Sequence, residues 1–204
     1  MKRNCGLLAA MMLMALCSFA PAKPGWREVS NKLYSFSVPT HWVQKEDPNG
    51  KILSEWEPRI PIRGNTVLFH LSVQSIHSPA KNEKEPTDRI NLVAESYERK
   101  DGGALSIDEI WEMKMSGLDK ILTILSLRET AAGAGQKRFV MEEISDSISA
   151  ATGTRKIRHN CFYLLFKSGE TVHFASISIR TSELNPESQA LINDILDSFR
   201  AKQK

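Results

Sequence analysis

The last part of the chain carries the pattern that most constrains the fold, two apolar-rich strands joined by a tight turn and followed by one helix. Residues 155–167 and 170–180 alternate as strands do, and Ser168-Gly169 between them is typical of a hairpin turn. Pairing Lys167 with Glu170 across the turn predicts one strongly apolar face. That face consists of Phe162, Leu164, Phe166, Ala175 and Ile177. Because apolar surface of this size is unfavourable in water, the hairpin requires a cover.

The final helix supplies that cover. Asn185 is a favourable N-cap residue and Pro186 suits a first helical turn, so we expect a helix to begin here. Its apolar positions form one stripe at helical spacing: Leu191, Ile192, Ile195, Leu196 and Phe199. A hairpin covered by a helix of this kind indicates an α+β fold.

An earlier helix and several more strands complete the predicted layout. Ser106 followed by Glu109 is a capping box, which opens a helix with Ile107, Ile110, Trp111, Met115 and Leu118 pointing inward. The apolar positions of residues 90–99 fit both a helix and an alternating strand. Other strands are expected over 34–38, 52–56, 66–76, 124–127 and 136–144. We therefore predict an antiparallel β-sheet flanked by α-helices, an α/β/α sandwich with a C-terminal amphipathic helix.

The N-terminus has the parts of a bacterial export signal. Lys2 and Arg3 give a positive start, and an apolar stretch over residues 7–16 follows, shorter than the roughly 20 residues that span a bilayer. Small residues then predict cleavage between Ala22 and Lys23. We expect a signal peptide over 1–22 and a single globular domain over 23–204. Within it we favour a surface loop over residues 78–88, with a domain boundary as the alternative.

Two alternatives to a cleaved signal are a retained membrane anchor and a lipoprotein attached at Cys17. Lipid-attachment sites have a small residue before the cysteine, and Leu16 does not fit that position. We therefore favour a protein that is periplasmic or secreted, with no stable membrane span after cleavage.

Cleavage changes both the charge and the cysteine content. The formal net charge falls from +3 to +1, because Lys2 and Arg3 leave and no acidic residue leaves with them. A domain so close to neutral has no electrostatic footprint for nucleic acid. Cys161 is then the one remaining cysteine, so no disulfide can form within the chain. Its apolar neighbours predict a buried, unreactive thiol.

The two ends of this domain resemble a known family. Residues 34–42 (YSFSVPTHW) are similar to the opening of PsbP-like domains, in which an alternating strand leads to Pro and Trp. The late hairpin and the helix ending near Ser198-Phe199 also resemble that family. PsbP-like domains share their fold with the yeast Ran-binding Mog protein and with DcrB, a bacterial envelope protein. The resemblance implies a sheet flanked by helices and an accessory or partner-binding role, with no shared catalytic set.

No pattern of residues commits the chain to metal or nucleophilic chemistry. The histidines, His41, His70, His77, His159 and His173, lack the spacing of zinc motifs. His159 and Cys161 share one strand face, but His173 points to the opposite face and a third ligand has to come from elsewhere. No Gly-x-Ser-x-Gly elbow is present. We expect no metal, no cofactor and no catalytic residues.

Three further patterns have structural explanations. The glycine-rich segment 131–138 predicts a hairpin turn, because a strand follows where a phosphate cradle needs a helix N-terminus. Glu142 and Glu143 are adjacent on a strand, so they face opposite ways and cannot act as a carboxylate pair. The basic cluster of Arg155, Lys156 and Arg158 is balanced by Glu142, Glu143 and Asp146 of the neighbouring strand.

The tryptophans are candidate contacts for a partner protein. Trp42 and Trp111 have positions typical of the core, whereas Trp26 and Trp56 have polar neighbours. Tryptophan is enriched at interface hot spots, although packing in the core is the simpler interpretation for all four.

These observations predict a non-enzymatic accessory protein of the bacterial cell envelope that binds another protein. A small-molecule carrier is one alternative, with a cleft between sheet and helices as its site. An immunity-type protein that neutralises a toxin is a variant of the first prediction. An undetected hydrolase is the remaining alternative.

Overall fold

The computed structural model of this chain describes residues 23–44, 60–62, 66–78, 90–99, 101–149 and 153–202. The predicted signal peptide, the predicted strand over 52–56 and most of the predicted loop over 78–88 lie outside these ranges. Ala22 and Trp56 are likewise outside the described residues, whereas Lys23 is the first of them.

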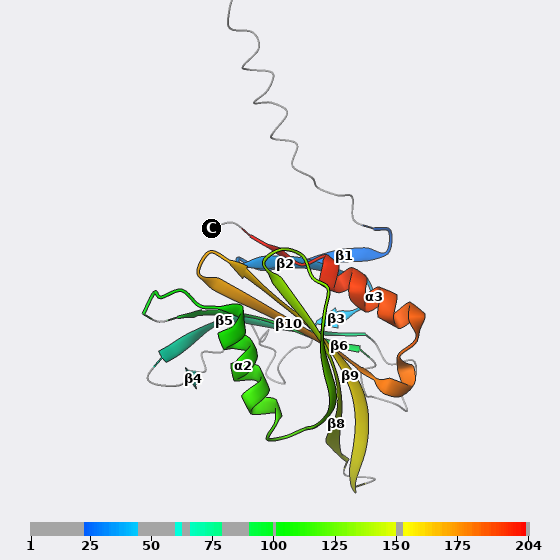
Figure 1. Cartoon of the computed structure of the whole chain (residues 1–204). Helices are drawn as coiled ribbons and strands as arrows, with labels where there is room; N and C mark the ends of the chain where they lie inside the picture. The colour runs from blue at the N-terminus through cyan, green and yellow to red at the C-terminus, as the bar shows by residue number, and fades with distance from the viewer. Residues whose placement is uncertain are drawn as a thin grey trace, which may run out of the picture.

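The described strands form two antiparallel sheets (Figure 1). The large sheet has the order β3-β5-β6-β10-β9-β8-β7, with β4 paired to β5. Its strands are β3 (Val43–Gln44), β4 (Ile60–Ile62), β5 (Thr66–His77), β6 (Ile90–Arg99), β7 (Thr123–Thr130), β8 (Gln136–Ser149), β9 (Gly153–Ser168) and β10 (Thr171–Arg180). The small sheet has the order β1-β2-β11, with β1 (Trp26–Ser30), β2 (Tyr34–Pro39) and β11 (Arg200–Ala201).

Helices cover both faces of the large sheet, as the predicted α/β/α sandwich requires. Helix α3 (Pro186–Asp197), preceded by the 3-10 turn η1 (Thr181–Glu183), packs on one face together with the small sheet. Helix α2 (Ile107–Leu118) packs on the other face. The α+β fold class, with its C-terminal helix, is therefore confirmed.

The β9–β10 hairpin is buried on both faces. The predicted apolar face, with Phe162, Leu164, Phe166, Ala175 and Ile177, packs against Ile192, Ile195, Leu196 and Phe199 at the end of the chain. The opposite face carries a second cluster under α2, including Cys161, Tyr163, Leu165, Val172 and Phe174. The second cluster was not predicted, although the uninterrupted apolar run over 161–166 is typical of a strand covered on both sides.

The hairpin register differs from the predicted one by two positions. The structure pairs Ser168 with Thr171, rather than Lys167 with Glu170. The loop is formed by Gly169 and Glu170, and the φ of +59° at Gly169 is a conformation that glycine adopts without a steric penalty. A shift of two leaves every side chain on its predicted face, because side chains alternate with a period of two.

Both helices begin where their caps predict. The Ser106 hydroxyl accepts a hydrogen bond from Glu109 N–H, and the Glu109 carboxylate accepts one from Ser106 N–H. Asn185 and Ser188 form the corresponding box at the start of α3. Side chains therefore satisfy backbone N–H groups that have no partner within the helix.

Residues 90–99 form a strand, although their apolar spacing also fitted a helix. Ile90, Leu92 and Ala94 are buried against the α3 side, whereas Tyr97 is buried under α2. β6 lies between β5 and β10, so both of its edges are paired.

The opening and closing motifs of the predicted family resemblance are in contact. The rings of Phe36 and Phe199 stack with centroids 4.4 Å apart. Ser37 N–H donates a hydrogen bond of 2.8 Å to the Ser198 hydroxyl oxygen, and β11 pairs with β2. β2 therefore belongs to the small sheet rather than to the large one. Strand β11 has only two residues, too few to show the alternation of apolar and polar side chains by which a strand is recognised.

Candidate protein-binding surface

The strand β7 lies at one edge of the large sheet and exposes large apolar side chains. Leu125 and Leu127 are each 43% exposed, and Ile121, in the turn before the strand, is 72% exposed. Within the described residues, Val43 is the one other large apolar side chain of comparable exposure, at 50%, and it lies on β3 at the opposite edge. We call residues 121–127 the apolar edge.

The backbone of β7 has only one neighbour among the described strands, β8. Its outer N–H and C=O groups therefore have no strand to pair with in this part of the chain. Natural proteins protect such an edge with charges, proline or a bulge, since it otherwise recruits other strands. β7 has one irregularity in its pairing, between Ile124 and Ser126, and leaves its leucines exposed beside it.

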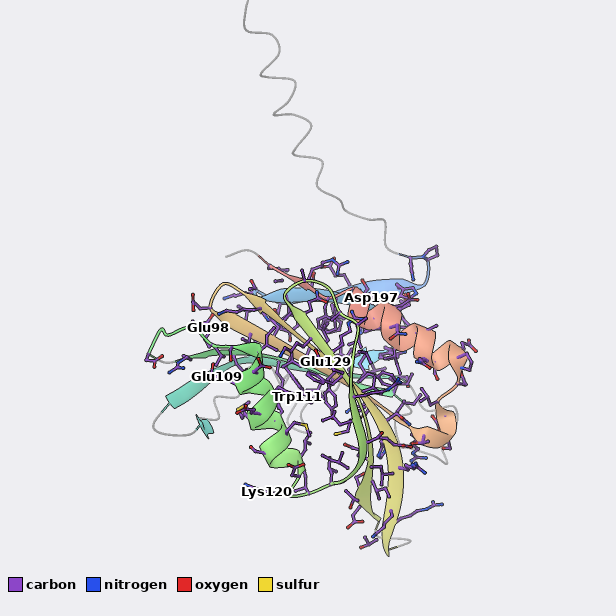
Figure 2. The ribbon with its side chains drawn as sticks, viewed as in Figure 1. Glu98, Glu109, Trp111, Lys120, Glu129 and Asp197 are labelled. Atoms are coloured by element: carbon purple, nitrogen blue, oxygen red, sulfur yellow. The ribbon has the colours of Figure 1, made fainter. Side chains whose placement is uncertain are left out.

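The inner side of this segment is anchored to the core. Leu122 and Ile124 are partly buried against the cluster beneath α2. Figure 2 shows Trp111 between α2 and the sheet, and its ring stacks on Phe139 with centroids 4.0 Å apart. Lys120, also labelled in Figure 2, lies in the turn that joins α2 to β7. The apolar edge is therefore held by a packed core while its outer side chains face solvent.

A buried polar chain lies in the sheet beside this edge. The Tyr163 hydroxyl, the Cys161 thiol and the Glu143 carboxyl are joined by hydrogen bonds. Burial raises the pKa of all three groups, which favours the protonated thiol. The predicted burial of Cys161 is confirmed. Glu143 is 7% exposed, and its Oε2 atom has no hydrogen-bond partner among the described residues.

Glu142 and Glu143 face opposite sides of the sheet, as predicted. Glu142 forms an ion pair of 2.6 Å with Arg158. Glu143 was expected to balance the basic cluster as well, but it is buried and bonded to Cys161 instead. Charge balance across the strands therefore explains only one of the two carboxylates.

The structure places His159 and His173, two of the histidines considered as metal ligands, on opposite faces of the large sheet. His159 lies near Ser145, with 3.3 Å between Nδ1 and the hydroxyl oxygen. Burial, and then the charge of Arg180, lowers the pKa of His159. His41 is exposed, whereas His70 and His77 lie on β5 and their side chains are not described. No group of three or more His, Cys, Asp or Glu side chains in the described ranges is arranged to hold a metal ion.

His173 lies on the other face of the sheet, in an aromatic cluster. Its ring stacks on Phe166 at a centroid distance of 4.6 Å and meets Tyr34 edge-on. Nδ1 is 2.9 Å from the Ser96 hydroxyl oxygen, and Nε2 has no partner among the described residues. Burial lowers the pKa of His173 to about 4, partly opposed by Glu98. The imidazole is therefore neutral at physiological pH.

The glycine-rich segment is a turn between β7 and β8, as predicted. Gln136 N–H donates to the Gly133 carbonyl at 3.1 Å, and Gly135 has a φ of +72°. Arg138, at the end of this segment, forms an ion pair of 2.7 Å with Asp197 of α3. Its guanidinium thus connects the sheet to the final helix.

The described tryptophans are mainly structural. Trp42 is buried in the core between the two sheets, and Trp26 packs partly buried against the same core. Trp111 is partly buried under α2. The tryptophans therefore contribute less to a candidate surface than the apolar edge, which no sequence pattern had indicated.

Comparison with known proteins concerns the fold. No protein-family model matches the sequence, and no curated protein matches it significantly. The solution structure of a cyanobacterial PsbP from Synechocystis is similar at 9% identity and a TM-score of 0.48, covering 91% of this chain and 97% of that one. The Ran-binding protein Mog1p of Saccharomyces cerevisiae is similar at 14% identity and a TM-score of 0.41, covering 86% and 94%.

A crystal structure from Bacteroides thetaiotaomicron is also similar, at 11% identity and a TM-score of 0.41, covering 84% of this chain and 46% of that one. PsbP-like and Mog-type proteins, which the sequence was expected to resemble, are therefore both represented among the similar structures. At these identities the likeness concerns the fold alone.

Proposed function

We propose that this chain is an exported, non-enzymatic accessory protein of the bacterial cell envelope, and that it binds another protein through the apolar edge. The observation that carries the proposal is the exposure of Leu125 and Leu127 on an edge strand of a well-packed sheet, together with that of Ile121 in the turn before it. Exposed apolar side chains that gather in one place are typical of protein interfaces.

The remainder of the described structure agrees with a binding role. Burial raises the pKa of the Cys161 thiol, which disfavours the thiolate form that acts as a nucleophile. Burial lowers the pKa of His173 to about 4, well below the working pH that suits a general base. No helix of the described residues is long and apolar enough to cross a membrane. The export signal, periplasmic or secreted location and cleavage before Lys23 belong to the same proposal and rest on the N-terminal sequence.

The test is affinity capture of the tagged full-length protein from envelope extracts, with mild cross-linking and mass spectrometry. We expect one stoichiometric protein partner. Replacing Leu125 and Leu127 with lysine should abolish its capture, because two buried charges at an interface are strongly unfavourable.

The control is Val43→Lys, which changes a similarly exposed side chain at the opposite edge of the sheet. This variant should retain the partner. If the wild-type protein captures no partner, or both variants retain it equally, the proposal is wrong. A toxin as the captured partner would identify the immunity-type variant of this function.

A further inference from the structure

The ends of β8 and β9 extend beyond the rest of the large sheet as a two-stranded arm (Figure 1). The pairing of β7 with β8 begins at Ile144, and the pairing of β10 with β9 ends at His159. Beyond these positions, β8 and β9 pair only with each other in the part of the chain that is described. We call residues 145–149 and 153–157 the arm.

Two strands alone make a weak structure in water. An isolated two-stranded ribbon is at best marginally stable, whereas a third strand satisfies the unpaired N–H and C=O groups of an outer edge. The arm has two such edges, since no described strand continues along either side of it. Its geometry therefore suits a segment in extended conformation.

The charges of the arm specify the chemistry of that segment. Arg155 and Lys156 are exposed, and neither forms an ion pair with any described residue. Asp146 lies opposite Lys156 in the register, but their charged groups do not reach ion-pair distance. Glu142 is already paired with Arg158, and Glu143 is buried beside Cys161. The acidic residues that were expected to balance the basic cluster therefore do not pair with Arg155 or Lys156, and the arm stays positively charged.

We propose that the arm binds an acidic segment of a partner protein, which pairs in extended conformation with the outer edge of β9 beside Arg155 and Lys156. This inference rests on the proposed protein-binding function and adds a second contact region with its own chemistry. Backbone hydrogen bonds supply the affinity, and oppositely charged pairs across the strands select an acidic sequence. A free phosphate or a lipid headgroup cannot satisfy the row of backbone groups.

The test uses the full chain purified from the envelope fraction and three probes. These are a capped Glu-Val peptide in which two consecutive Glu residues place one carboxylate on each face of a strand, its Lys-Val counterpart, and phosphatidylglycerol vesicles. Hydrogen exchange of the arm amides and the affinity for each probe are measured. The variant pair R155E/K156E reverses the charges of the arm. The pair R128E/K167E is the matched control, because it reverses two exposed cations elsewhere on the sheet.

We expect the acidic peptide to protect the arm amides, and R155E/K156E to weaken its binding by about tenfold, the effect of one to two cross-strand charge pairs. R128E/K167E should bind as the wild type does. Equal weakening by both variant pairs, preference for the Lys-Val peptide, binding of vesicles alone, or no binding would each overturn the inference. The proposed function has its own test. There, replacing Leu125 and Leu127 with lysine must abolish capture of the partner protein, whatever the peptides do.

Discussion

His173 is the residue whose burial has the clearest consequence for stability. The imidazole is 2% exposed, packs against Phe166 and Tyr34, and has a pKa of about 4 in the folded protein. An unfolded chain has an ordinary histidine pKa of about 6.5. Because the folded pKa is lower, protonation favours the unfolded state, and stability is lost as the pH falls from about 6.5 toward 4.

We predict that the wild-type protein loses about 2 kcal/mol of unfolding free energy through His173 between pH 7 and pH 5. His173→Gln removes this titration while keeping a polar group for Ser96. Urea unfolding at the two pH values gives the difference for each protein. His159 and the other histidines are common to both, so their contribution cancels. An equal loss of stability in the variant would contradict the assignment to His173.

At the scale of elements, the two capping boxes should each stabilise the fold. Ser106→Ala and Asn185→Ala should each cost about 1 kcal/mol, because each leaves a helix N-terminus without its side-chain acceptor. The helices lie on opposite faces of the sheet, so the double variant should cost about the sum.

Thermal unfolding measures these effects, with a shift of about 2–4 °C for each kcal/mol in a domain of this size. Ser116→Ala is the control, since Ser116 is an exposed serine within α2 that caps nothing. A capping variant with the same melting temperature as this control would show that its box does not stabilise the helix.

The helices and most strands could be predicted from local sequence patterns, whereas the order of the strands in the sheet could not. Both helices, the final hairpin and its apolar face follow from caps and periodicity near each residue. The turn at Gly169 was placed one residue early, but side-chain alternation preserved the faces. β6 was ambiguous, because a strand that buries side chains on both of its faces shows mixed apolar spacing. The exposure of Leu125 and Leu127 depends on which strand ends the sheet, and local sequence does not contain that information.

At the scale of the whole molecule, contacts between the chain ends organise the fold. Ser37 and Ser198 are hydrogen-bonded although 161 residues separate them, and Phe36 stacks on Phe199 in the same place. The family resemblance at residues 34–42 and at Ser198-Phe199 thus marks two parts of one contact. The same architecture leaves β7 as an edge, because β8 is its only described neighbour. The proposed binding surface is therefore a consequence of strand order.

The most direct test of the central claim is site-specific photo-crosslinking in envelope extracts. A photoreactive amino acid replaces Leu127 on the apolar edge or, in a matched protein, Val43 on the opposite edge. We predict that position 127 crosslinks to one discrete protein partner and that position 43 does not. Crosslinking from position 43 alone, or from neither position, would contradict the claim that the apolar edge is the binding surface.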